Sequence, residues 1–94
     1  MYGTIARVKI DPSRLQELTA LNRRIATAPG QLARYMYQMD ADPGEVFLVA
    51  VFESKEAYWA NANSPEQHQR FQEFRALMLA DPEWHDGAIV DMAP

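Results

Sequence analysis

Cysteine is absent from the 94 residues of the chain. This absence excludes disulfide bonds, thiolate nucleophiles and cysteine-bound zinc together. Histidine is scarce too, because only His68 and His85 occur and their spacing does not match that of paired metal ligands. A glycine-rich loop that would cradle the phosphates of a nucleotide is also missing. We therefore expect no metal site and no bound flavin or other nucleotide cofactor.

Clustered positive charge and long apolar runs are lacking as well. The nine Lys and Arg residues are scattered and outnumbered by thirteen Asp and Glu, for a formal net charge of −4, which argues against a nucleic-acid partner. No apolar run approaches the roughly 20 residues that cross a bilayer. Arg7 and Lys9 interrupt the N-terminal apolar pattern where a signal peptide would need its apolar core. We expect a cytoplasmic protein with no membrane association, formed by a single domain over residues 1–94.

The longest apolar run, Val46–Phe52, organises the rest of the chain. It is too short for a lone helix and rich in β-branched and aromatic residues, which predicts a strand buried on both faces. Ser54 follows it and suits a helix N-cap, because its hydroxyl can accept from the free amides of the first turn. A central strand that leads directly into a helix is therefore expected here.

The other segments show the periodicities of strands and helices. In order they are a strand over Tyr2–Ile10, a helix from Asp11 to Ala28, a strand over Leu32–Asp40, helices over Lys55–Ala62 and from Ser64 to before Asp81, and a strand over Trp84–Met92. Asp42-Pro43-Gly44-Glu45 fits a type II turn, with glycine at positive φ. This order predicts an α+β, ferredoxin-like split β-α-β fold, in which a four-stranded antiparallel sheet carries helices on one face.

Such a fold leaves the second face of the sheet uncovered. The run from Val46 to Phe52 has no polar residue on either side, so a bare second face would expose a large apolar patch. Either two copies stack sheet on sheet, or a monomer tolerates a few exposed apolar side chains. We expect the homodimer.

Three short stretches follow one another in the middle of the chain. They are the apolar strand ending in Phe52-Glu53-Ser54, then Lys55-Glu56-Ala57, then Ser64-Pro65. In this respect the chain resembles the antibiotic-biosynthesis-monooxygenase-like domains of the dimeric α/β-barrel group, and the element order extends the likeness over nearly the whole chain. The resemblance implies a dimeric α/β barrel and a cofactor-independent monooxygenase for a flat aromatic or quinol-type molecule. The substrate anion would itself activate oxygen, so the protein need only bind, orient and stabilise charge.

The chain departs from this family's pattern at two positions. Many relatives place a histidine seven residues after the cap and another after Ser-Pro, where this chain has Asn61 and Glu66. In the haem-degrading branch a tryptophan stands at the first of these positions, and the iron-binding histidine comes ten residues later, where this chain has Phe71. Phenylalanine cannot bind iron, so we expect no haem. The missing histidine favours the alternative function, a non-catalytic dimeric ligand-binding or interaction module.

Two asparagines are candidate ligand contacts in the pocket expected between the sheet and the helices. Asn61 lies one turn from Ala57 and shares its side of the helix. Its amide could hold a substrate hydroxyl or carbonyl, or it could bond nearby backbone at a helix end. Asn22 interrupts the apolar stripe of the first helix, either as a second polar contact or as a rim residue.

The remaining candidates are a possible base and the apolar walls of the pocket. His68 would titrate in the range useful for a general base, unless it faces solvent. Phe71 would be an apolar wall. Tyr35 and Tyr37 suit a flat apolar ligand, although aromatic residues in a strand more often belong to a core or a dimer interface. Trp59 points roughly opposite to Asn61 on the helix wheel, so we expect it at an edge or interface rather than in the pocket.

Overall fold

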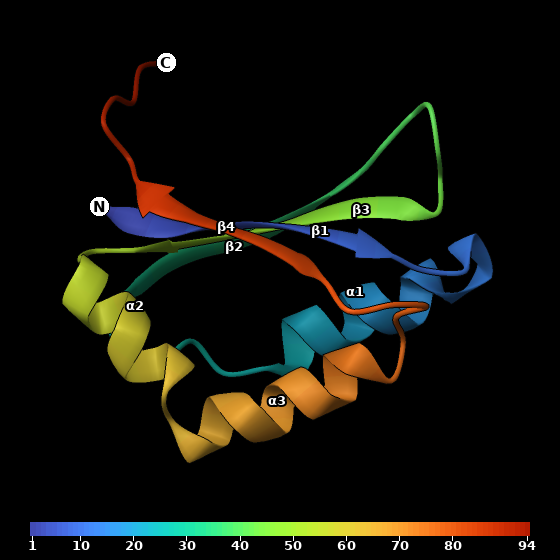
Figure 1. The fold of residues 1–94 in the computed structure, drawn as a ribbon, viewed down its shortest axis with the longest axis horizontal. Helices are drawn as coiled ribbons and strands as arrows, with labels where there is room; N and C mark the ends of the chain where they lie inside the picture. The colour runs from blue at the N-terminus through green and yellow to red at the C-terminus, as the bar shows by residue number, and fades with distance from the viewer.

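The computed structural model describes residues 1–94 and contains one antiparallel sheet with every helix on the same side of it (Figure 1). The elements are β1 (Tyr2–Lys9), the 3₁₀ turn η1 (Pro12–Arg14), α1 (Leu15–Arg24), β2 (Gln31–Gln38), β3 (Glu45–Phe52), α2 (Lys55–Ala62), α3 (Pro65–Arg75) and β4 (Glu83–Ala88). The strands lie in the order β2-β3-β1-β4, so β1 and β3 are central and β2 and β4 form the edges. The predicted ferredoxin-like α+β fold is confirmed.

Strand alternation separates a helix-covered face from an open face. In β1, Thr4, Ala6 and Val8 are buried beneath the helices, whereas Ile5 between them is 50% exposed. The register pairs Ala6 with Leu48 of β3 and so carries the same alternation across the sheet. Every second residue of each strand therefore faces the helices.

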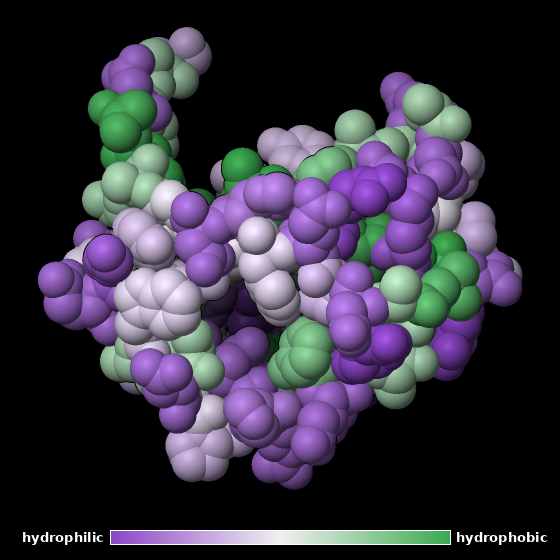
Figure 2. Space-filling model, viewed as in Figure 1, coloured by the Kyte–Doolittle hydropathy of each residue, from purple (hydrophilic) through white to green (hydrophobic).

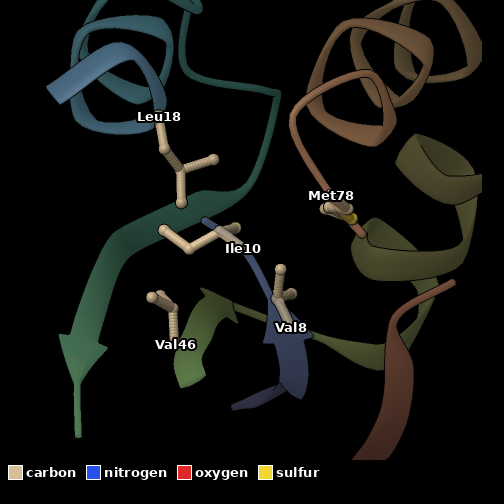
Figure 3. Close-up of a cluster of buried hydrophobic side chains, with 5 residues drawn as sticks. All are labelled: Val8, Ile10, Leu18, Val46 and Met78. Atoms are coloured by element: carbon tan, nitrogen blue, oxygen red, sulfur yellow. The ribbon is translucent and has the colours of Figure 1, made fainter. Parts of the chain in front are cut away.

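The main core lies where α1 crosses the central strands. Figure 3 shows its five side chains, which come from β1 and the residue that follows it, α1, β3 and the segment after α3, and gather in one region. They are Val8, Ile10, Leu18, Val46 and Met78, each at most 6% exposed. Their full burial provides the hydrophobic stabilisation that holds α1 and the end of α3 against the sheet.

A second, smaller core lies at the other end of the sheet, under α2. Its buried members are Ala28, Phe52 and Tyr58, and the Phe52 and Tyr58 rings meet edge to face with centroids 5.5 Å apart. The two buried clusters share no residue. Met78 of the first cluster and Phe52 and Tyr58 of the second line one cavity between the sheet and the helices.

The open face is largely apolar and has no cover in the monomer. Tyr35 and Tyr37 of β2 are 46% and 55% exposed, and their rings pack edge to face with centroids 5.9 Å apart. The register places Tyr35 beside Val49, and Val49 beside Ile5. One end of this face carries charged side chains instead, where Arg7 and Lys9 form ion pairs with Glu45 and Asp42.

The predicted N-caps are present, but several elements end earlier than expected, by one or two residues in β1 and β2 and by more in α1, α3 and β4. Side chains of Asp11, Ser54 and Ser64 each accept a hydrogen bond from a backbone N–H of the following turn. Helix α1 ends at Arg24, not at Ala28, and the Arg34 side chain of β2 donates to the carbonyls of Asn22, Ile25 and Ala26 around this end. Strand β4 ends at Ala88, not at Met92, and the tail beyond it leaves the sheet on the side away from the helices (Figure 1).

The predicted type II turn at Gly44 is wrong. The turn from Asp42 to Glu45 does close with a hydrogen bond of 2.9 Å from the Glu45 N–H to the Asp42 carbonyl, but Gly44 does not have positive φ. The Asp42 carboxylate accepts from the Gly44 N–H at 3.0 Å, which stabilises a tight turn without left-handed backbone. Positive φ occurs instead at Gly30 (φ +76°), in the Pro29-Gly30 turn that leads into β2.

None of the helices can cross a membrane, since the longest, α3, has 11 residues and a bilayer span takes about 20.

Candidate functional site

A cavity of about 420 Å³ lies between the sheet and the helices, in the gap between the two core clusters. Figure 2 shows a hollow on the face where β4 lies above α2 and α3 in Figure 1. Most of its lining is apolar or aromatic. The volume falls within the range of about 300–1,000 Å³ that is usual for pockets that bind small organic molecules.

Tyr58 and Asp86 form one polar end of the cavity. The Tyr58 hydroxyl donates a hydrogen bond of 2.7 Å to the Asp86 carboxylate. Burial, and then this bond, raise the pKa of the Tyr58 phenol above its ordinary value. Tyr58 is therefore a neutral donor whose oxygen retains lone pairs for a ligand hydroxyl.

Arg34 forms the opposite end, entering from β2. Its Nη2 donates to the carbonyls of Asn22 and Ile25 at 2.9 and 2.7 Å, and its Nη1 donates to the Ala26 carbonyl at 3.3 Å. The guanidinium thus caps the C-terminus of α1, where the helix dipole favours a cation. Burial, and then the positive charge of Arg70, lower the pKa of Arg34, although an arginine stays charged.

These two ends lie in one row across the sheet. Arg34 pairs with Ala50, Ala50 with Thr4, and Thr4 with Asp86, so all four are on the helix-covered face. Three strand spacings of about 4.8 Å separate the outer two backbones by about 14 Å. The residues between them, Ala50 and Thr4, have small side chains. A flat molecule can therefore lie over the middle of the row with a charged or polar group at each end.

Asn61 and His68 lie on the helical side of the cavity. The Asn61 amide donates to the Gln67 side chain at 3.4 Å, which is a long, weak hydrogen bond. The Ser64 N–H, which a complete capping box would direct to Gln67, bonds the Asn61 carbonyl instead. His68 is exposed; its backbone N–H bonds the Ser64 carbonyl, but its imidazole has no hydrogen-bond partner in the protein. Both side chains are free to turn toward a ligand.

Aromatic side chains complete the wall. Phe71 of α3 packs against Trp84 of β4, with ring centroids 5.9 Å apart. Trp59 also lines the cavity, contrary to the expectation from the helix wheel. Its ring meets that of Tyr58 edge to face at 5.1 Å, which draws it toward the cavity although it is 40% exposed.

Five of the six predicted contacts come together around this cavity. Asn22, Tyr35, Asn61, His68 and Phe71 all line it, whereas Tyr37 does not. Tyr37 lies on the open face, because strand alternation places it on the same side as Phe47, its β3 partner. Tyr35 borders the cavity, but its ring packs on Tyr37 on that same open face. The interpretation of Tyr37 as a cavity wall is therefore wrong.

Sequence reasoning missed Arg34, Tyr58 and Asp86. Tyr58 precedes Asn61 by three residues on one helix and so shares its face, which was a usable indication. Arg34 lies two residues before Met36 and therefore on the same side of the strand, which is the side that faces the helices. Asp86 gave no indication, since its role depends on the register of β4 against β1.

No group of three His, Cys, Asp or Glu side chains in the structure is arranged to hold a metal ion.

Comparison with known proteins identifies relatives of the same fold. Residues 1–74 match the family model described as antibiotic biosynthesis monooxygenase. A protein from Chloroflexus aurantiacus J-10-fl, whose name places it among the antibiotic biosynthesis monooxygenases, has 24% identity and a TM-score of 0.78 over 99% of this chain and 96% of its own. SnoaB, a cofactor-independent oxygenase from Streptomyces nogalater solved as an Asn-to-Ala mutant, has 15% identity and a TM-score of 0.77 over 99% and 96%. No curated protein matches the chain.

Proposed function

Because the chain belongs to the antibiotic biosynthesis monooxygenase family, we propose that it oxidises a flat aromatic molecule of the phenol or quinol type with molecular oxygen and without a bound cofactor. The observation that carries this proposal is the cavity of about 420 Å³ beneath the helices. Its walls are mainly apolar and aromatic, and Arg34 and Asp86, the latter bonded to Tyr58, stand at the two ends of one row. Such a site binds a planar ring and places its oxygen substituents.

An anthrone-like phenol fits this chemistry without any further reductant. Oxidation of its ring methylene to a carbonyl releases four electrons, which reduce one molecule of oxygen. One oxygen atom enters the carbonyl and the other leaves as water with the two methylene hydrogens. A bound phenolate transfers electrons to oxygen by itself once the site removes water and stabilises the developing charge.

The polar groups of the cavity have distinct roles in this scheme. Tyr58 accepts a hydrogen bond from the substrate hydroxyl and, through its own bond to Asp86, connects the substrate to a carboxylate that can take up a proton. His68 is the second candidate base, at the helical wall. The Asn61 amide exchanges its weak bond to Gln67 for a stronger bond to the charge that develops on the substrate.

We also propose that the protein acts as a homodimer of the α/β-barrel kind, with the open faces of two sheets stacked. Ile5, Tyr35 and Tyr37 are each about half exposed on this face, and Val49 lies between the first two in the sheet. Contiguous exposed apolar surface of this extent is typical of an interface. Stacking two sheets at about 10 Å removes this surface from water.

Oxygen uptake tests the proposed oxidation. A panel of small hydroquinones and anthrones is added to the purified protein in an oxygen electrode, with a protein-free blank. Uptake above the blank is expected for at least one anthrone. Replacement Asn61→Ala should then lower the rate about a hundredfold, since losing one such donor typically costs about that much.

Asn63→Ala is the matched control. Asn63 lies two residues further on, is exposed at the end of α2 and does not line the cavity. Its replacement should leave the rate unchanged. Equal rates for Asn61→Ala and the parent would remove Asn61 from the mechanism. If no phenol in the panel gives uptake above the blank, the protein is a ligand-binding or interaction module on the same fold.

A further inference from the structure

The cavity has an excess of positive charge that the rest of the protein does not share. The chain carries a net charge of −4, yet the charged residues that line the cavity are Arg34, Arg70 and Asp86, with His68 as a further basic group. Asp86 is bonded to Tyr58 at the β4 end. Arg70 lies close enough to Arg34 for its charge to lower the pKa of Arg34, so the β2 end holds two cations, and no carboxylate lines the cavity there.

Neither arginine has an ion-pair partner. Five of the nine basic residues form ion pairs with Asp or Glu, and Arg34 and Arg70 are not among them. Arg34 is partly buried in spite of this. A cation that is withdrawn from water without a carboxylate partner is costly unless another anion binds it.

Capping of α1 accounts for only part of the Arg34 side chain. Three of its five N–H groups donate to backbone carbonyls, which leaves the Nε–H and one Nη1–H without a partner in the protein. The C-terminus of a helix offsets roughly half a charge, whereas Arg34 and Arg70 together carry two. The three carbonyls also hold the guanidinium rigidly in place, so that an anion would meet donors that are already oriented.

We propose that the ligand is a planar aromatic molecule with a carboxylate, which Arg34 and Arg70 bind at the β2 end of the cavity. This inference rests on the proposed function and specifies its substrate class. The ring lies over Ala50 and Thr4, the small residues of the row that joins the two ends. The oxidisable hydroxyl then reaches Tyr58 at the far end.

A linear hydroxy acid of two fused rings is a direct probe. 6-Hydroxy-2-naphthoic acid has its carboxylate and phenol at opposite ends, and its methyl ester and 2-naphthol differ from it only at the carboxylate. Fluorescence titration without oxygen gives the Kd of each for the full-length protein. The acid should bind at least about tenfold more tightly than the ester or 2-naphthol, as expected for charge-assisted hydrogen bonds. Preference for 2-naphthol over the acid would mean that the phenol is what the arginines bind, and it overturns the proposal.

Two variants and a matched control assign the preference to the arginines. Arg70→Gln should lose the preference while the affinity for the ester stays unchanged, and it should fold normally because Arg70 forms none of the ion pairs of the structure. Arg34→Gln should do the same if its thermal melt shows a folded protein. Arg24→Gln removes the same charge from the surface of α1, outside the cavity, and should keep the preference.

The outcomes separate this proposal from the oxygenase itself. Equal affinity for acid and ester, no binding of the acid, or a preference that survives Arg70→Gln each overturns the carboxylate site. A preference that depends on Arg70, found in a protein that takes up no oxygen with any phenol, supports the carboxylate site and rejects the oxygenase.

Discussion

A single charge on the open face should dissociate the proposed dimer. Val51 of β3 faces away from the helices, between Ala33 of β2 and Gly3 of β1. None of these neighbours carries a charge that could pair with an introduced carboxylate. We therefore choose Val51→Asp as the test, because in the monomer the new carboxylate remains in contact with water and the fold is retained.

The expected loss of dimer stability follows from how many charges the stacked sheets bury. Strands β1, β2 and β3 have eight residues each, so four strands make a face of roughly 27 by 19 Å. Stacking buries one unpaired carboxylate from each protomer. At roughly 3 kcal/mol for each, near the low end for an uncompensated buried charge, the dimer loses about 6 kcal/mol, or about four powers of ten in Kd.

Sedimentation equilibrium or light scattering over the micromolar range measures this directly. The parent should have the mass of a dimer and Val51→Asp that of a monomer. Ala60→Asp adds the same charge to an exposed position on α2 and should remain dimeric. A parent that is monomeric at these concentrations, or a Val51→Asp protein that stays dimeric with an unchanged circular dichroism spectrum, would refute the stacked-sheet interface.

Three further predictions concern stability. Because burial raises the pKa of Tyr58, the unfolded chain releases this proton first, so the free energy of unfolding should fall as pH rises above about 10, and less so in Tyr58→Phe. Glu45 has a lowered pKa, chiefly through its bond to Arg7. The stability that this carboxylate contributes is present above its ordinary pKa and is lost in acid. Glu45→Gln should therefore flatten the acid side of a curve of unfolding free energy against pH. Gly3→Ala would drive a Cβ into a carbonyl oxygen of the facing strand and should cost about 3 kcal/mol or more in urea denaturation. Gly87→Ala meets nothing within 4 Å and should stay within about 0.5 kcal/mol of the parent.

The fold was predictable because its determinants are local in the sequence. The apolar run from Val46 to Phe52, the alternation from Tyr2 onward and the cap residues Ser54 and Ser64 each specify an element from a few neighbouring residues. The turn type at Gly44 was not predictable in this way. Its hairpin and the Pro29-Gly30 segment contain the same Pro-Gly pair, and the side chain of Asp42, rather than the pair itself, decides between them.

The candidate site was predictable only in part, because it depends on pairing between distant segments. Asn61 and Phe71 could be placed from helical periodicity. Arg34 and Asp86 stand at the two ends of one cavity only because four strands pair in this register. Trp59 was misplaced because an ideal helix wheel does not include the pull of a neighbouring ring, here Tyr58.

The two edges of the sheet determine how far self-association can proceed. Edge strands with unpaired N–H and C=O groups can add strands from other molecules and start fibrous aggregates. Here β4 has only six residues, with Glu83 and Asp86 among them, and β2 has an irregular register between Gln31 and Ala33. Both features discourage strand addition. The open face is therefore the surface through which copies would associate in the proposed dimer, rather than either edge. In the proposed dimer the two open faces cover each other, so assembly would stop at two rather than grow into a fibre.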